Sequence, residues 1–250
     1  MKKQLAAGDL VLGSWITLAH PAVAEIMARA GFDWLAVDLE HSVITIREAE
    51  ELIRVADLSG VTPLVRLSWN DPIQIKRVMD AGAHGVIVPM VNSREQAEVA
   101  VAAVRYPAAG TRGVGLARAQ GYGTSFAKYK DWLEENAIVI VQVEHIQAVE
   151  NLESILSVDG VDGFIVGPYD LSGSLGVPGD FEHPAMQAAM ARIREVAARI
   201  GARSGIHVIE PDPAELAQRL EQGYTFVAYS LDIRMLDAAC RTGLAAVRKG

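Results

Sequence analysis

The alternation of short apolar runs with longer amphipathic segments restricts the fold of this chain more than any other feature. Runs rich in Val, Ile, Leu and Phe indicate buried strands, and a segment of helical period follows each. The predicted strands are 10–17, 33–38, 62–66, 85–89, 138–144, 163–167, 204–208 and 226–230. The predicted helices are 21–30, 45–58, 71–81, 93–105, 147–156, 184–200, 212–222 and 232–247. This order predicts an α/β fold, a (β/α)8 TIM barrel, with a doubly wound open sheet as the alternative.

Length and composition agree with one domain over residues 1–250. A chain of 250 residues with 50% hydrophobic content can bury a large core, and no linker divides it. The net charge of −8 is not accompanied by a basic patch, so nucleic acid and membrane surfaces are not expected partners. The single Cys240 fits a reducing cytoplasm, and no apolar run is long enough for a signal peptide or a membrane span.

One stretch departs from the regular pattern. Residues 106–137 form a long, glycine-rich connection after the fourth strand, and Arg112 and Arg118 lie within it. Long connections in compact domains are usually functional or disordered. We expect this one to lie on the active side of the barrel and to cover the pocket.

Charged side chains stand at the ends of several predicted strands. They are Asp38 at the end of the second strand and His41 just after it, Arg66 at the end of the third, Glu144 at the end of the fifth and Asp170 after the sixth. Active sites of TIM barrels lie at the carboxyl ends of the strands. These residues should therefore converge on one pocket.

Glu144 and Asp170 are candidate metal ligands. Two hard oxygen donors on neighbouring strands, with the other positions left to water and substrate, suit Mg²⁺ or Mn²⁺. The alternative is structural: an Asp that caps a helix and a Glu paired with an arginine.

Arg66 and His41 have equally specific chemistry. A guanidinium binds a carboxylate through two parallel hydrogen bonds, as expected for a small oxoacid, although an ion pair with Asp38 or Glu40 would also explain Arg66. An imidazole next to carboxylates can transfer a proton, whereas a lone histidine is usually structural. His207, at the end of the seventh strand, also points to the barrel mouth. No lysine stands at a strand end, which makes Schiff-base chemistry improbable.

Several motifs resemble the HpcH/HpaI aldolases, in the same order, from about residue 8 to 245. They are Asp38-Leu39-Glu40-His41-Ser42, Val65-Arg66 followed by Trp69-Asn70-Asp71-Pro72, Val88-Pro89-Met90-Val91, Arg105-Tyr106-Pro107 through Arg112-Gly113-Val114-Gly115, Val141-Gln142-Val143-Glu144 and Gly167-Pro168-Tyr169-Asp170-Leu171-Ser172. The resemblance implies a metal-dependent pyruvate aldolase on a (β/α)8 barrel. It also implies a homohexamer, a trimer of dimers that exchange the last helix.

The resemblance assigns a role to each matching position. It places the divalent metal, Mg²⁺, Mn²⁺ or Co²⁺, on Glu144 and Asp170, pyruvate on Arg66, and proton transfer on His41. Further positions that it implies are the carboxylates Asp38 and Asp80 associated with His41, the acceptor-side Arg118, and the backbone amides of Gly167 and Asp170 for the pyruvate carboxylate. His207 replaces an aliphatic residue of the homoprotocatechuate-pathway enzymes, so we expect it to influence the choice of acceptor.

Asp80 poses a geometric problem for this assignment. It lies about nine residues along the helix that begins at Asp71, so a rise of 1.5 Å per residue carries it roughly 13 Å from the active face. We therefore expect it to reach His41 only from a neighbouring subunit.

The function predicted from the sequence is reversible cleavage of 4-hydroxy-2-oxo acids into pyruvate and an aldehyde, catalysed by a metal-dependent carbon–carbon lyase. Its partners are small oxoacids and aldehydes. The same site also permits oxaloacetate decarboxylation or condensation with another oxoacid. A non-catalytic oxoacid-binding protein is a third alternative.

Overall fold

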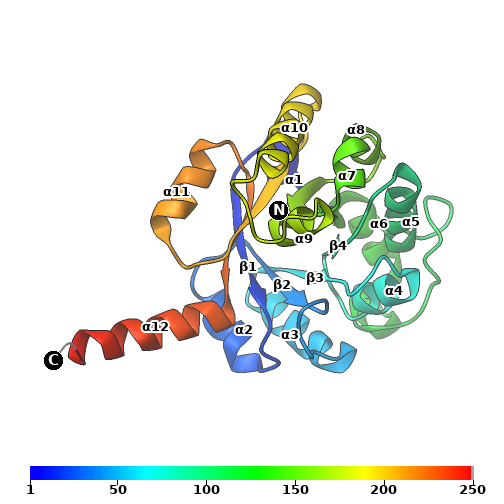
Figure 1. Cartoon of the computed structure of the whole chain (residues 1–250). Helices are drawn as coiled ribbons and strands as arrows, with labels where there is room; N and C mark the ends of the chain where they lie inside the picture. The colour runs from blue at the N-terminus through cyan, green and yellow to red at the C-terminus, as the bar shows by residue number, and fades with distance from the viewer. Residues whose placement is uncertain (249–250) are drawn as a thin grey trace.

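The computed structural model describes residues 1–248 and contains a closed barrel of eight parallel strands in chain order (Figure 1). The strands are β1 (Val11–Ile16), β2 (Trp34–Asp38), β3 (Thr62–Arg66), β4 (Gly85–Val88), β5 (Ile138–Val143), β6 (Gly163–Val166), β7 (Ser204–Val208) and β8 (Phe226–Leu231). All eight predicted strands are confirmed. Pairing of β8 with β1 closes the sheet, so the open-sheet alternative is wrong.

The helices lie around the barrel and include every predicted segment, although 147–156 forms two helices, α7 and α8. They are α1 (Lys2–Ala7), α2 (Pro21–Ala28), α3 (Ile46–Leu58), α4 (Pro72–Asp80), α5 (Arg94–Val104), α6 (Phe126–Asn136), α7 (Ile146–Glu150), α8 (Leu152–Leu156), α9 (Pro168–Ser174), α10 (Pro184–Ile200), α11 (Pro213–Glu221) and α12 (Asp232–Val247), with a 3-10 helix η1 (Arg118–Gly123). Side-chain caps fix several starts. Thr45 and Glu48 form a capping box on α3, and Asp71 caps α4.

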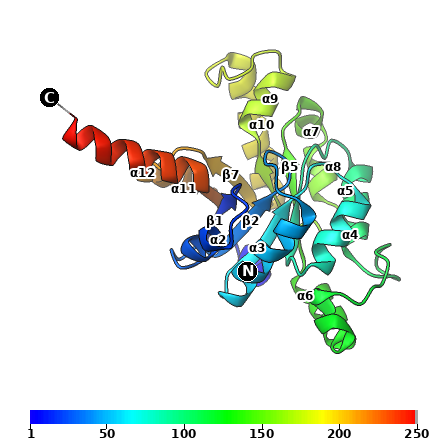
Figure 2. The same ribbon diagram turned by 90° about the horizontal axis from the view of Figure 1, so that it is seen from below.

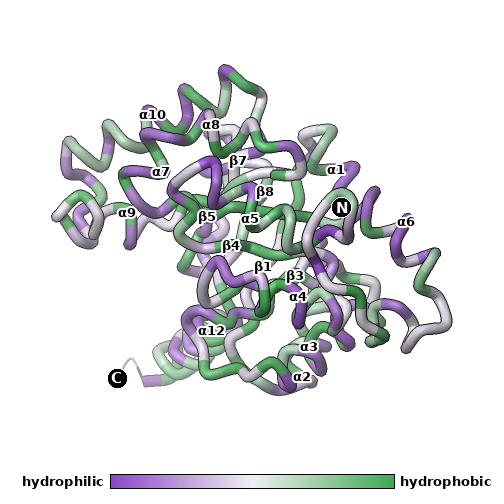
Figure 3. Tube along the Cα trace, turned by 90° about the vertical axis from the view of Figure 1, so that its right-hand side faces the viewer, coloured by the Kyte–Doolittle hydropathy of each residue, from purple (hydrophilic) through white to green (hydrophobic). Residues whose placement is uncertain are grey.

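The barrel interior is filled by aromatic and aliphatic side chains. The Trp34 ring stacks on Phe226 at 4.5 Å, and Trp15 meets Trp34 edge-on at 6.0 Å. A Cβ atom at Gly13 would approach the Trp34 ring to 1.9 Å, so only glycine fits there. Apolar residues dominate the central strands (Figure 3). The interior is therefore a packed core, and a substrate can bind only at an end of the barrel.

The segment between α5 and β5 does not lie where the sequence suggested. It contains η1 and α6, and it lies at the amino-terminal ends of the strands, because it connects the end of a helix to the start of the next strand. Arg118 donates to Asp57 Oδ2 at 2.5 Å and to the Ala81 carbonyl, both at the ends of helices. The expectation that residues 106–137 cover the active face of their own barrel is wrong.

The last helix leaves the barrel. α12 extends away from the other helices (Figures 1 and 2), and Asp232 is its only buried residue among those described. Leu236 and Leu244 are more than half exposed. No helix within residues 1–248 combines the length and the apolar character needed to cross a membrane.

Candidate active site

Six of the residues predicted from the sequence line one cavity of about 390 Å³ at the carboxyl ends of the strands. They are Asp38, His41, Arg66, Gly167, Asp170 and His207. Glu144 lines a second cavity, which also contains Met90. The two cavities are neighbours because Tyr169 and Asp170 line both of them.

Arg66 is held in a fixed orientation by Asp38 and Trp15. Its Nε and Nη2 donate to the two carboxylate oxygens of Asp38 at 2.9 and 2.6 Å, and its guanidinium lies 4.3 Å from the centre of the Trp15 ring. Burial raises the pKa of Asp38, but the hydrogen bonds and charge of Arg66 outweigh it and hold that pKa below its ordinary value. The ion pair with Asp38, which the sequence left as an alternative, is thus present. This ion pair takes up one edge of the guanidinium, and the edge formed by Nη1 and Nη2 keeps donors for a second carboxylate.

The loop after β2 positions His41 through its backbone. Asp38 Oδ1 accepts the amides of Glu40 and His41 at 2.9 and 3.2 Å. The His41 ring is 60% exposed, and the nearest carboxylate is that of Glu40, 3.7 Å from Nε2. Asp38 therefore contacts His41 through the main chain, and Glu40 is the carboxylate beside the imidazole.

Glu144 is a buried carboxylate whose orientation is fixed by two donors. Its Oε1 accepts the Met90 amide at 2.7 Å, and its Oε2 accepts from the Gln142 side chain. Met90 adopts a φ of 51°, a rare conformation for a side-chain-bearing residue, and such strain is typical of functional sites. Burial raises the pKa of Glu144, with a further increase from the charges of Glu40 and Asp170.

Glu144 and Asp170 form a donor set that fits a divalent cation. Both are oxygen donors, and Glu40 adds a third negative charge nearby, with Arg66 as the compensating cation. A hard cation would remove this repulsion and replace the lost solvation of Glu144. Within residues 1–248, no three His, Cys, Asp or Glu side chains form a metal cluster. Glu144 and Asp170 therefore stay the candidate protein ligands predicted from the sequence, and the other coordination positions would be left to water and substrate.

Gln142 is a site residue that the sequence reasoning did not identify. Its amide nitrogen donates to both Glu144 and Glu40, and its Oε1 is buried without a partner among the described residues. Gln142 and Glu144 are two positions apart, so they project to the same side of the chain. A polar residue inside the apolar run of β5 was the available signal.

Gly167 leaves room for the Glu144 carboxylate. Its amide donates to the Val143 carbonyl at 3.1 Å, so the expectation that this amide receives a substrate carboxylate is wrong. A Cβ atom at this position would lie 2.9 Å from Glu144 Oε2. The Asp170 amide lies in the first turn of α9, where helix amides have no intrahelical acceptor. It remains a candidate donor to substrate.

His207 forms the wall of the cavity next to Trp15. Its Nε2 lies 3.2 Å from the Ser230 carbonyl, and its ring is 5.7 Å from the Trp15 ring. Burial and the charge of Arg66 lower the pKa of His207 to about 4. The imidazole is therefore neutral at pH 7. Because a carbonyl only accepts, Nε2 carries the proton and Nδ1 is an acceptor.

Asp80 and Arg118 do not join this group within one chain. Asp80 pairs with the buried Arg112 at 2.5 Å. Arg118 lines a separate cavity of about 550 Å³ with His84 and Trp132, at the amino-terminal end of the barrel. The geometric expectation that Asp80 is remote from His41 in its own subunit agrees with this arrangement.

The chain is similar to known proteins over nearly its whole length. A sequence model of the HpcH/HpaI aldolase/citrate lyase family matches residues 12–239. A hydroxypyruvate/pyruvate aldolase of Sagittula stellata is 40% identical over 239 residues, which cover 95% of this chain and 93% of that protein. A 4-hydroxy-2-oxo-heptane-1,7-dioate aldolase of Salmonella arizonae is 41% identical, over 94% of this chain and 89% of its own. The crystal structure of an HpcH/HpaI aldolase/citrate lyase family protein from Burkholderia cenocepacia superposes with a TM-score of 0.93 at 34% identity, covering 99% of this chain and 98% of that one.

Proposed function

Because this chain belongs to the HpcH/HpaI aldolase/citrate lyase family, we propose that it is a pyruvate aldolase, which reversibly cleaves 4-hydroxy-2-oxo acids into pyruvate and an aldehyde. The observation that carries the proposal is one cavity at the barrel mouth lined by His41, Arg66 and Asp170, with Glu144 beside it. The relatives named as a hydroxypyruvate/pyruvate aldolase and a 4-hydroxy-2-oxo-heptane-1,7-dioate aldolase support the same carbon–carbon lyase activity.

Glu144 and Asp170 would hold the divalent cation, Mg²⁺, Mn²⁺ or Co²⁺. When bound, it supplies Lewis-acid polarisation of the oxoacid. Gln142 and the Met90 amide keep Glu144 in one orientation, so the ligand needs little rearrangement when the cation enters.

The chain's own residues bind the donor and move the proton. The free edge of Arg66 would bind the pyruvate carboxylate through two parallel hydrogen bonds. Asp38 and Trp15 hold the guanidinium in one orientation. The Asp170 amide would add a donor. His41, exposed at the rim, would exchange the proton of the substrate hydroxyl or methyl carbon, directly or through water.

Substitution of Arg66 by lysine should weaken pyruvate binding. Arg66→Lys keeps the positive charge but removes the second edge and the stacking on Trp15, so we expect the KM for pyruvate to rise about tenfold or more. Steady-state kinetics at saturating aldehyde measure this. An unchanged KM in the folded variant would remove Arg66 from the donor site.

An aldehyde panel tests the proposed function. Pyruvate is supplied with aldehydes and Mg²⁺, Mn²⁺ or Co²⁺, and products are quantified by mass spectrometry; oxaloacetate is supplied separately. Aldol product formed faster than oxaloacetate decarboxylation supports the aldolase. The reverse order would favour the decarboxylase, which needs the same site. No turnover of either substrate would leave the non-catalytic oxoacid-binding protein.

We also propose a homohexamer, built as a trimer of dimers. Two observations support association between chains: α12 extends from the barrel with Leu236 and Leu244 exposed, and Asp80 and Arg118 lie far from the site of their own chain. An exchanged α12 would bury its apolar face against a partner. Asp80 and Arg118 would then serve a neighbouring subunit's site. The cytoplasmic location stays a prediction from the sequence.

Subunit mixing tests whether Asp80 acts between chains. His41→Ala and Asp80→Asn proteins should each be inactive alone, and mixing under conditions that exchange subunits should restore activity, because some sites combine two intact residues. Native mass spectrometry confirms the hybrids. Hybrids without activity would show that the two residues are not shared between chains.

A further inference from the structure

One wall of the active cavity is not used by the reaction assigned above. Part of the cavity is bounded by the end of β8 and the first turn of α12, with Leu231, Ile233 and Arg234. Arg66 and Arg234 are the two arginines that line this cavity. Arg66 is assigned to the pyruvate carboxylate and His41 to proton transfer, and the buried His207 is neutral at pH 7. Arg234 is therefore the cavity-lining cation that remains for the acceptor.

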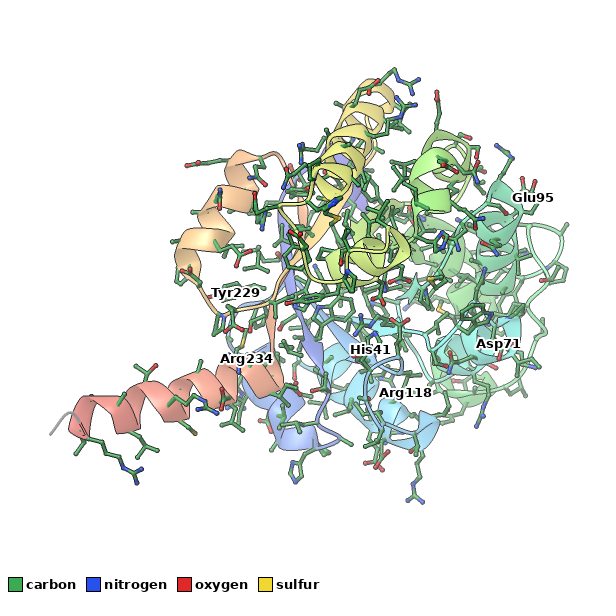
Figure 4. The ribbon with its side chains drawn as sticks, viewed as in Figure 1. His41, Asp71, Glu95, Arg118, Tyr229 and Arg234 are labelled. Atoms are coloured by element: carbon green, nitrogen blue, oxygen red, sulfur yellow. The ribbon has the colours of Figure 1, made fainter. Side chains whose placement is uncertain are left out.

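Arg234 is anchored firmly although it lies on a projecting helix. It is the third residue of α12, two positions after Asp232. The buried Asp232 carboxylate accepts the amides of Thr17 and Leu18 at 2.8 Å each and the Thr17 hydroxyl at 2.6 Å. These bonds tie the start of α12 to the loop after β1. The backbone at Arg234, at the start of α12 (Figure 4), is therefore held in place independently of what the rest of α12 contacts.

The Arg234 guanidinium is paired with a carboxylate that a substrate carboxylate could replace. Glu210, which follows β7, accepts from Nε at 3.2 Å and from Nη2 at 2.7 Å, and Asp237 accepts from Nη1 at 2.6 Å. The Glu210 side chain is 56% exposed and that of Arg234 is 34% exposed. Solvent-exposed ion pairs contribute little to stability. A second carboxylate arriving from the cavity could therefore take the place of Glu210 at small cost.

We propose that Arg234 is the residue of this chain that selects the acceptor, by binding a carboxylate at the far end of the aldehyde in place of Glu210. The inference rests on the proposed aldolase function and adds to it a residue that determines acceptor specificity. The preferred acceptors are short aldehydes that end in a carboxylate. His207 lines the same cavity, and its Nδ1 would accept a hydrogen bond from a hydroxyl group of the same aldehyde.

The test compares two acceptors of similar length with pyruvate as donor. Succinic semialdehyde carries the carboxylate, and butanal does not. The measured quantity is the ratio of their kcat/KM values. Arg234→Gln should lower this ratio by about tenfold to a hundredfold, the loss expected for hydrogen bonds to a charged group. Arg234→Lys should retain part of the ratio, because the charge remains while the fork is lost.

Glu210→Gln provides a test in the opposite direction. Without the competing carboxylate, Arg234 is free for the substrate, so the ratio should rise above that of the wild type. Arg241→Gln is the matched control, because Arg241 pairs with Asp237 on the same helix but does not line the cavity. It should leave the ratio at the wild-type value. The Glu210 variant keeps the proposal testable even if Arg234→Gln does not fold.

The outcomes separate this inference from the proposed function. If the wild type forms no product from pyruvate with either aldehyde, the aldolase assignment fails. If the wild type is active but its ratio is unchanged in Arg234→Gln, or is lowered in Glu210→Gln, the acceptor carboxylate binds elsewhere and the role of Arg234 is refuted.

Discussion

Replacing Glu144 by glutamine should reduce aldol turnover by about a thousandfold or more. The substitution keeps the size of a side chain that is 3% exposed but removes the charge from one of two candidate metal ligands. A metal acting as a Lewis acid supplies several kcal/mol of transition-state stabilisation, and each ~1.4 kcal/mol is worth a factor of ten. Mn²⁺ binding, followed by electron paramagnetic resonance, should weaken in parallel.

Glu150→Gln is the matched control for this change. Glu150 is an exposed glutamate on α7, six positions along the chain from Glu144, and it lines neither cavity of the site. It should leave turnover and Mn²⁺ affinity at wild-type values. A Glu144→Gln enzyme that binds Mn²⁺ with unchanged affinity would exclude Glu144 as a ligand, whatever its activity.

Replacing His41 by alanine should lower turnover and leave donor binding nearly unchanged. A positioned general acid–base contributes about 10²–10⁴-fold to rate, and His41 makes no contact with the guanidinium that would bind pyruvate. We therefore expect kcat to fall within that range while the KM for pyruvate changes by less than about threefold. Steady-state kinetics with a single aldehyde at saturation measure both constants.

His20→Ala controls for the loss of an imidazole. His20 is exposed and caps α2 through its side chain, away from the cavity. Its replacement should lower the free energy of unfolding by about 1 kcal/mol and leave kcat unchanged. If the KM for pyruvate rose in His41→Ala while kcat did not change, His41 would be a binding residue and the proton would be moved by another group.

The sequence was sufficient for the fold because local and global signals agree. Apolar runs, proline at helix starts and capping residues such as Thr45, Asp71 and Asp212 mark the same boundaries that the barrel requires. The exceptions include α1, which precedes the first strand, and the segment before β5. In α6 the buried residues are Tyr129 and Leu133, and two such positions give only a weak helical period.

The site was predictable where it depends on strand ends and was not where it depends on hydrogen bonds. Strand order brings His41, Arg66 and Asp170 together regardless of side-chain detail. The pairing of Arg66 with Asp38 was only one of two alternatives, because sequence spacing does not choose between partners. The Gly167 amide donates to the Val143 carbonyl because of the strand register of the barrel, and register cannot be deduced from single residues. Contacts between subunits could not be predicted either, because they depend on the surface of a second chain.

Exchange of the pyruvate methyl protons with solvent tests the aldolase assignment most directly, because it needs no knowledge of the aldehyde. Pyruvate is incubated with the protein and Mn²⁺ or Mg²⁺ in D₂O, and the loss of the methyl signal is followed by proton NMR after the metal is removed. Exchange should be fast with the metal, should stop after chelation and should return when the metal is restored. Absence of exchange in the metal-loaded protein, or exchange at the same rate after complete chelation, would contradict a metal-dependent pyruvate aldolase.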